Sequence, residues 1–303
     1  MEQRTLGKTG LSATVLGYGA MALRQLPISS TTDASENPGG ALLNQLLDAG
    51  INFIDTAPDY GNSEEIIGQS IAHRRDEYLL ASKCGCNIPR NDDPDAPRHI
   101  WSADRLRANI ELSLERMKTD YLDFWQLHNP EPEAVRKGDL LRVMEEVRDA
   151  GKVRHIGISS TLPHIPVYLE WDVFASFQIP YSALERTHEH AITAVAKSGA
   201  ATIIRGGVAK GEPEGDREAS DRWKFWDAAG LDELRDPDES RSAFLLRFTI
   251  THPHLHTTIV GTRNPDHLAE NLKAMERGPL PQDVYEQARN RLEAAGQVPE
   301  PVA

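Results

Sequence analysis

Eight short apolar runs rich in β-branched residues alternate with amphipathic segments, and this alternation constrains the fold more than any other feature of the chain. The expected strands are Val15–Tyr18, Ile51–Ile54, Tyr78–Ser82, Tyr121–Leu127, Val153–Ile158, Val173–Phe177, Ala201–Ile204 and Thr257–Val260. Alternating strands and helices pair the strands in parallel through crossover helices. Eight such units in 303 residues predict one α/β domain over residues 1–303, a closed (β/α)8 TIM barrel.

Three segments lie outside this eightfold pattern. Residues 1–14 are expected to form a small hairpin that turns at "GKTG" and could close the bottom of the barrel. Residues 206–239, after the seventh strand, are polar and rich in Gly and Pro, which predicts a long loop. Residues 281–295 are expected to form an extra C-terminal helix.

The charge and composition exclude several classes of protein. A formal charge of -13 repels phosphate backbones and anionic membranes, so we expect no nucleic-acid or membrane partner. No apolar stretch approaches the ~20 residues of a membrane span, and the polar N-terminus does not resemble a signal peptide. With only Cys84 and Cys86, one residue apart, a structural disulfide is not expected. The expected location is the cytoplasm.

Polar residues stand at the ends of three successive expected strands and in the loop that follows one of them. They are Asp55, Tyr60 in the loop after it, Lys83 and His128. Singly, each has an ordinary structural explanation, such as a helix cap, a turn residue, a solvated lysine or a core histidine. Together they converge on one mouth, because the carboxyl ends of the strands of a barrel lie at the same end.

The four residue types form a coherent acid–base group. A tyrosine ionises near ~10, so we expect a charged Lys83 to lower the pKa of Tyr60 and make it a better proton donor. Asp55 would hold Lys83 in its charged form. A neutral His128 could hydrogen-bond and orient a substrate oxygen, with Tyr60 as the general acid.

The motifs "DTAPDYG", "SKCG", "LHNP" and "GTRNPDHLAENLKA" resemble those of the aldo-keto reductase family, in family order. The resemblance runs from "RTLGKTGLSATVLGYGAM" to "NLKA", nearly the whole chain. It implies NADPH as the cofactor and Asp55, Tyr60, Lys83 and His128 as the catalytic tetrad. Tyr60 would then protonate a small-molecule carbonyl as hydride arrives, and the protein would be a monomer or a weak homo-oligomer.

The resemblance also implies a cofactor site. Ser159 and Gln178 match the residues that bind the nicotinamide amide, and Ser160 stands where the family often has Asn. The pyrophosphate is expected near Gly206, Gly207 and Lys210. The adenosine phosphate is expected at the start of the last barrel helix, around Gly261, Thr262, Arg263, His267, Glu270 and Asn271.

Arg205 departs from the family pattern, which often places an aromatic side chain against the nicotinamide at this position. One hypothesis is that Arg205 lies beside the nicotinamide and disfavours its positively charged, oxidised form. The alternative is that it pairs with a carboxylate of the following loop. The expected walls of the substrate pocket are Met21, Trp101, Trp125 and Trp223, although Trp125 could instead face the outer helices.

No metal site is expected from the sequence. "THPHLH" places His252, His254 and His256 at alternating positions, but it precedes the eighth strand and therefore lies at the bottom of the barrel. "CGC" alone cannot complete a tetrahedral site.

Two other activities stay open at the level of sequence. One is a Schiff-base aldolase that uses Lys83, and the other is a non-catalytic NADPH sensor.

Overall fold

The computed structural model describes residues 1–29, 31, 33, 35–88, 95–209, 211 and 221–302, and its centre is a closed barrel of eight parallel strands. The strands follow one another around the barrel in the order β10-β3-β4-β5-β6-β7-β8-β9. Their bounds are β3 Leu16–Gly19, β4 Phe53–Asp55, β5 Leu79–Cys84, β6 Leu122–His128, β7 Val153–Ser159, β8 Ser176–Pro180, β9 Ala201–Arg205 and β10 Thr257–Val260. The predicted (β/α)8 TIM barrel is confirmed.

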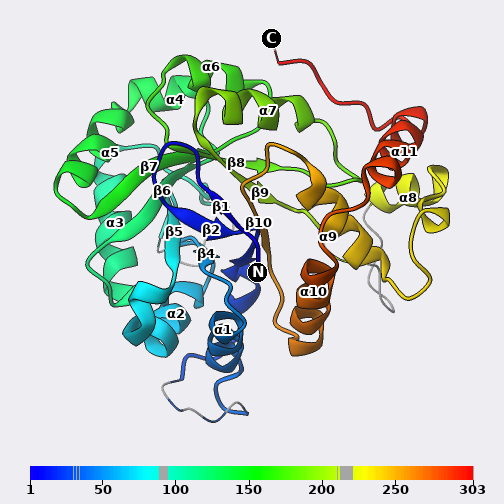
Figure 1. Cartoon of the computed structure of the whole chain (residues 1–303). Helices are drawn as coiled ribbons and strands as arrows, with labels where there is room; N and C mark the ends of the chain where they lie inside the picture. The colour runs from blue at the N-terminus through cyan, green and yellow to red at the C-terminus, as the bar shows by residue number, and fades with distance from the viewer. Residues whose placement is uncertain are drawn as a thin grey trace.

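Helices surround the barrel (Figure 1). Their bounds are α1 Pro38–Asp48, α2 Ser63–Ile71, α3 Ala103–Met117, α4 Pro132–Lys137, α5 Leu140–Asp149, α6 His164–Glu170, α7 Glu189–Ser198, α8 Lys224–Ala228, α9 Arg241–Thr251, α10 Pro265–Arg277 and α11 Gln282–Ala294. Short 3-10 helices are η1 Ala20–Leu23, η2 Ala72–Glu77, η3 Asp221–Trp223 and η4 Leu231–Glu233. The extra C-terminal helix predicted at 281–295 is α11, and the segment predicted as a long loop contains η3, α8 and η4.

Several predicted strands begin too early in the chain. The apolar run at Ile51 was expected to be strand, but the amide of Ile51 bonds to the carbonyl of Leu46 at 3.0 Å and closes the C-terminus of α1. An apolar residue that caps a helix has the same pattern as the first residue of a buried strand, so periodicity alone does not separate them.

A small apolar cluster fills the lower part of the barrel, and the N-terminal hairpin closes it. The hairpin strands β1 Gln3–Thr5 and β2 Ser12–Thr14 pair antiparallel and lie across the barrel end (Figure 1). Leu6 and Ala13 are fully buried and join Phe53, Ala81, Phe124, Ala201 and Ile203 inside the barrel. The amide of Lys8 bonds to the carbonyl of Gly199 at 2.8 Å, which docks the hairpin turn on the end of α7.

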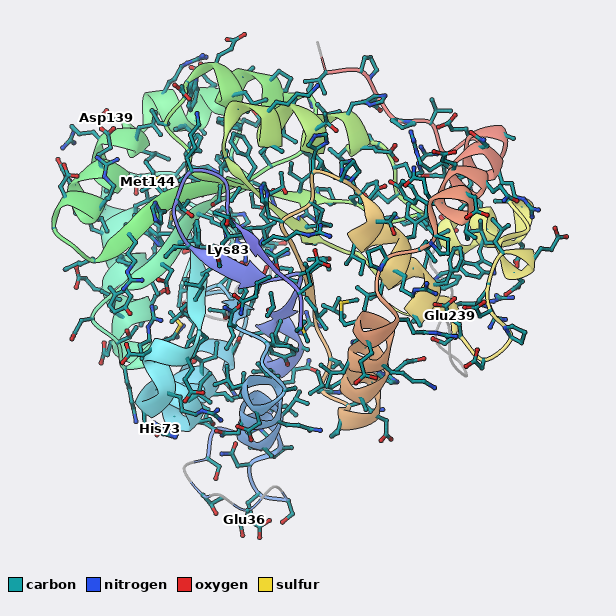
Figure 2. The ribbon with its side chains drawn as sticks, viewed as in Figure 1. Glu36, His73, Lys83, Asp139, Met144 and Glu239 are labelled. Carbon is teal, nitrogen blue, oxygen red and sulfur yellow. The ribbon has the colours of Figure 1, made fainter. Side chains whose placement is uncertain are left out.

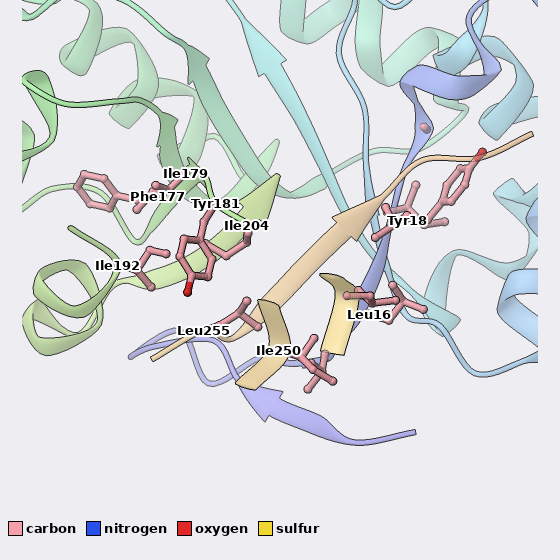
Figure 3. Packing of buried hydrophobic residues seen from close by; sticks show 14 of the residues in the cluster. Leu16, Tyr18, Phe177, Ile179, Tyr181, Ile192, Ile204, Ile250 and Leu255 are labelled. Carbon is pink, nitrogen blue, oxygen red and sulfur yellow. The ribbon is translucent and has the colours of Figure 1, made fainter. Parts of the chain in front are cut away.

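Side chains alternate between the barrel interior and the helical layer. On β9, Ala201 and Ile203 belong to the interior cluster, whereas Ile204 belongs to the core between strands and helices. Figure 3 shows part of this outer core, with Ile179 and Ile204 of the barrel and Ile192 of α7. A residue two positions from an interior residue on the same strand therefore also points into the barrel. At the C-terminal end of a strand such a residue points toward the mouth, the end of the barrel where the C-terminal ends of the strands meet.

No helix within the described ranges is long and apolar enough to cross a membrane.

Candidate active site

Lys83 and Asp55 form a buried ion pair at the mouth of the barrel. The Nζ atom of Lys83 lies 2.6 Å from Oδ2 of Asp55 and donates a second hydrogen bond to the carbonyl of Thr56 at 2.8 Å. The side chains are 0% and 2% exposed. Figure 2 labels Lys83 near the middle of the barrel. Asp55 ends β4 and Lys83 is the last residue but one of the adjacent strand β5, so the fold itself brings them together.

The other carboxylate oxygen of Asp55 ties two further strands to this pair. Oδ1 accepts hydrogen bonds from Nε2 of Gln126 on β6 at 3.1 Å and from Nε2 of Gln178 on β8 at 2.8 Å. Gln178 was predicted to bind the nicotinamide amide, and its own amide NH₂ is engaged with Asp55 in this structure. Asp55 thus links four strands of the barrel.

Burial alone would lower the pKa of Lys83, since it penalises the ammonium form. The negative charge of Asp55, together with the hydrogen bond that Asp55 accepts from Lys83, offsets this penalty, and the pKa of Lys83 lies above its usual range. Lys83 is therefore an ammonium at neutral pH. A Schiff-base aldolase needs a neutral amine, so this environment disfavours that alternative.

Tyr60 lies in the loop between β4 and α2, with its ring centroid 5.1 Å from Nζ of Lys83. Desolvation by burial raises the pKa of Tyr60, and Lys83 lowers it by a smaller amount. The net shift is upward, so the prediction of a lowered pKa is wrong for the protein without its cofactor. The reason is that the loop buries the phenol more deeply than the sequence indicated. Tyr60 accordingly keeps its proton over a wide pH range and remains available as a donor.

His128 ends β6 beside Tyr60, with ring centroids 5.8 Å apart in an edge-to-face arrangement. Desolvation holds the pKa of His128 well below its usual range, and the positive charge of Lys83 adds to this effect. The imidazole is therefore neutral at physiological pH, as the sequence-based chemistry required. The structure brings all four predicted tetrad residues to one mouth.

Three further residues surround His128 that the sequence analysis missed. Asp59 and Cys86 place Oδ1 and Sγ at 3.6 Å and 3.4 Å from Nδ1 of His128. The ring of His99 lies 4.7 Å from that of His128, centroid to centroid. The sequence offered a signal for two of them, because Asp59 directly precedes Tyr60 and Cys86 lies in "CGC". His99 lies in the loop between β5 and α3, and no sequence pattern pointed to it.

The predicted pocket residues divide into two groups. Trp101 stacks on His99 with ring centroids 5.5 Å apart, and Met21 is exposed on η1 after β3, so both lie at the mouth. Trp125 was predicted as a pocket wall, but this is wrong. Its neighbours Phe124 and Gln126 point into the barrel, so Trp125 points outward and is fully buried against the helical layer.

Trp223 is also buried, with its ring centroid 5.7 Å from that of Trp226 on α8. Trp226 in turn packs edge-to-face on Phe244 of α9 at 5.6 Å. The structure therefore places Trp223 in the packing of the outer layer.

Ser159 ends β7 at the mouth, and Ser160 follows it directly. The hydroxyl of Ser159 donates to Oδ1 of Asn129 at 3.0 Å, and the amide of Ser160 bonds to the carbonyl of Gln178 at 3.1 Å. Asn129 follows His128 and adopts a positive φ of 62°, and it is a further residue at the mouth that the sequence analysis did not single out. These polar groups lie where the resemblance places the nicotinamide amide.

Arg205 ends β9, two residues after Ile203, and its side chain therefore points toward the interior at the mouth. Its Nε atom is buried without a hydrogen-bond partner among the described residues. Gly206 follows with φ 78°, and a Cβ at Gly207 would meet Oγ1 of Thr258 at 2.7 Å. Lys210 lies outside the described residues. An unpartnered guanidinium nitrogen beside a glycine turn fits an anionic ligand.

The sequence analysis predicted the adenosine phosphate at the N-terminus of α10. Asn264 is the N-cap and accepts a hydrogen bond from the amide of Asp266 at 2.9 Å, and Pro265 occupies the first turn. Arg263 and His267 are exposed at this end of the helix, Glu270 is half-buried, and Asn271 is buried. Thr262 is anchored because its carbonyl accepts a hydrogen bond from the Tyr18 hydroxyl at 2.7 Å, and Gly261 packs closely on Gly19.

The three histidines of "THPHLH" lie before β10, at the end of the barrel opposite the tetrad. Nδ1 of His256 lies 2.8 Å from Oγ1 of Thr202, at the start of β9. Burial lowers the pKa of His252 and of His256 to about 4. His252 and His256 are therefore neutral at physiological pH.

The geometry defines an α/β-barrel site with a neutral imidazole, a protonated phenol and a paired ammonium at one mouth.

The model of the Aldo/keto reductase family matches residues 15–293. The uncharacterized oxidoreductase YqkF of Bacillus subtilis is 27% identical over 90% of this chain and 91% of its own length. The NADH-specific methylglyoxal reductase of Escherichia coli is 29% identical over 63% of this chain and 62% of its own length.

Among solved structures, the holo form of aldo-keto reductase AKR11C1 from Bacillus halodurans matches with a TM-score of 0.82 and 26% identity. The match covers 96% of each chain. The chain belongs to the aldo-keto reductase family. It is therefore an oxidoreductase, and its cofactor is a nicotinamide nucleotide.

The ion pair leads to a testable prediction about stability. Asp55→Asn or Lys83→Met leaves one buried group without its partner, and each should lower the free energy of unfolding by about 3–5 kcal/mol. The double variant should lose clearly less than the sum of the two, because it leaves no unpaired charge. Urea denaturation of all four proteins measures the coupling. Strictly additive losses would show that the two groups are energetically independent.

Proposed function

We propose that the protein reduces aldehydes or ketones to alcohols with NADPH, and that Tyr60 is the general acid. The observation that carries this proposal is the buried pair of Lys83 and Asp55 beneath Tyr60, next to a neutral His128. The bound nicotinamide would supply the hydride. Family membership supports carbonyl reduction as the type of reaction.

Each residue of the tetrad has a role that follows from its environment. Neutral His128 holds the carbonyl oxygen through a ring N–H and orients it. Tyr60 donates its proton to that oxygen as negative charge develops there, which completes the alcohol. The ammonium of Lys83 stabilises the phenolate that remains, and Asp55 keeps the buried ammonium charged.

The residues around α10 support the choice of NADPH. The positive end of the helix dipole at the N-terminus of α10 and the exposed side chain of Arg263 suit a phosphate dianion. One relative carries the name NADH-specific, so cofactor preference varies among similar chains and needs direct measurement.

Tyr60→Phe tests the catalytic proposal. The variant should lose about a hundredfold or more in the rate of NADPH oxidation with a carbonyl panel, because general acid catalysis contributes about that much. NADPH binding should persist, as followed by fluorescence. Tyr121→Phe removes the same hydroxyl at the opposite end of the barrel and should keep full activity. Tight NADPH binding without carbonyl-dependent oxidation by the wild type would instead favour the sensor.

Arg263→Ala tests the cofactor preference. Loss of one charged partner of the phosphate should weaken NADPH binding about tenfold and leave NADH binding unchanged. Lys273→Ala removes an exposed charge from α10, about two turns beyond the start of that helix, and serves as the matched control. Calorimetric titration gives the dissociation constants. Equal constants for NADPH and NADH in the wild type would refute the preference.

Arg205→Phe tests the proposed position of Arg205 beside the nicotinamide. Removing its charge should improve NADP⁺ binding by roughly fivefold, about 1 kcal/mol, and leave NADPH binding nearly unchanged. Arg205→Lys keeps the charge and should retain most of the wild-type ratio. An unchanged ratio of the two dissociation constants in Arg205→Phe would contradict this position.

A further inference from the structure

Four potential metal ligands from different loops meet beside the tetrad. They are Asp59 in the loop after β4, Cys86 and His99 in the loop after β5, and His128 at the end of β6. Each offers one ligand atom, and these four atoms all lie within 4.8 Å of one another. Thiolate, imidazole and carboxylate are the side-chain ligands that Zn²⁺ uses in proteins.

Three of the four atoms already have the spacing of zinc ligands. Sγ of Cys86, Nδ1 of His128 and Oδ1 of Asp59 form a triangle with sides of 3.4, 3.5 and 3.6 Å. Tetrahedral zinc with bonds of about 2.0–2.3 Å places neighbouring ligand atoms about 3.3–3.6 Å apart. The triangle therefore needs little rearrangement to hold an ion, and His99 is close enough to supply the fourth ligand.

Two described parts of the segment after β5, one around Cys86 and one around His99, pair with each other and present both ligands. Cys86 and His99 form an isolated antiparallel bridge, and the amide of Asn87 bonds to the carbonyl of Arg98 at 2.8 Å. Nδ2 of Asn109 on α3 donates to the carbonyl of Cys86 at 3.0 Å. A site whose ligands are already ordered loses less conformational entropy on binding an ion.

Contacts with neighbouring side chains orient two of the proposed ligands, Asp59 and His99. NH2 of Arg98 donates to Oδ2 of Asp59 at 2.9 Å, which leaves Oδ1 toward the thiol and the imidazole. Trp101 stacks on the ring of His99. Nε2 of His99 is buried and has no hydrogen-bond partner among the described residues. An unsatisfied buried nitrogen in such a cluster is costly, and a bound cation would remove that cost.

The local charges permit a divalent ion. The nearby ammonium of Lys83 is already paired with Asp55, and Arg98 is paired with Asp59. Burial raises the pKa of the Cys86 thiol, so the thiol is protonated in the metal-free protein. An ion at the site displaces that proton, and one thiolate and one carboxylate then balance its two charges.

We propose that Asp59, Cys86, His99 and His128 bind Zn²⁺ or another thiophilic divalent ion. The proposal replaces the expectation of no metal site, which considered only residues close together in the sequence. On the proposed function, an ion bound to Nδ1 of His128 restrains the imidazole that orients the carbonyl and occupies space at the mouth next to Tyr60, and it should therefore slow reduction. The site would thus be an inhibitory one.

Cobalt titration of the full-length protein tests the site directly. One equivalent of Co²⁺ should give the visible absorption of tetrahedral cobalt together with a thiolate-to-cobalt charge-transfer band, and Zn²⁺ should abolish both. Cys86→Ser should lose the charge-transfer band. Cys84→Ser should keep it, because Sγ of Cys84 bonds to the carbonyl of Gln126 away from the cluster. A band that is absent from the wild type, or that survives in Cys86→Ser, overturns the proposal.

Two further measurements separate the site from the proposed function. His99→Ala should weaken cobalt binding about tenfold or more while its circular dichroism matches that of the wild type. Unchanged binding would remove His99 from the ligand set. Zn²⁺ should inhibit NADPH oxidation by the wild type and not by Cys86→Ser, each relative to its own metal-free rate. Inhibition that is equal in both would refute the inhibitory role. If the wild type reduces no carbonyl, the cobalt spectra still decide the site.

Discussion

The ion pair between Lys83 and Asp55 is the interaction on which the rest of the mouth depends. Burying two charges costs several kcal/mol per ion unless every polar atom finds a partner. Here Asp55 accepts from Lys83, Gln126 and Gln178, so the strands β4, β5, β6 and β8 meet on one carboxylate. The pair is weak evidence for stability as such, but it fixes the charge state of Lys83 and its position beneath Tyr60. The chemistry proposed for the site needs both.

Two regular patterns in the sequence explain which predictions succeeded. The first is the alternation of apolar runs with amphipathic segments, which predicted eight parallel strands. The C-terminal ends of those strands then indicated Asp55, Lys83 and His128 as candidate site residues. The second pattern, the alternation of side chains along one strand, decides which way Trp125 points. It lies between Phe124 and Gln126, both of which point into the barrel, so it faces the helices. A one-residue difference in register moves a side chain from the pocket to the outer core.

Contacts between loops could not be predicted from the sequence. Asp59, Cys86 and His99 reach His128 from two loops, and no periodicity sets where loop side chains point. The direction of the pKa shift of Tyr60 was missed for a related reason. Lys83 does lower that pKa, but desolvation raises it more, and the burial of one phenol is a property of the folded loop. Residue types and strand ends thus indicated the tetrad, whereas its environment needed the structure.

His128 connects the two roles inferred for the mouth. Deep burial keeps its imidazole neutral, and a neutral imidazole can orient a carbonyl oxygen or bind a metal ion. The burial of His128 therefore suits both roles, the orientation of a carbonyl and the binding of a metal ion. The group next to Nδ1 is what distinguishes the two roles. With the Cys86 thiol protonated, Nδ1 has only weak partners, and the other ring nitrogen is available to the substrate. With the thiol ionised around a metal, Nδ1 becomes a ligand, and the thiolate and the Asp59 carboxylate balance the charge of the ion. The imidazole is then held by the ion as well as by the fold, so on this proposal the cysteine at position 86 decides whether the mouth can hold a metal ion.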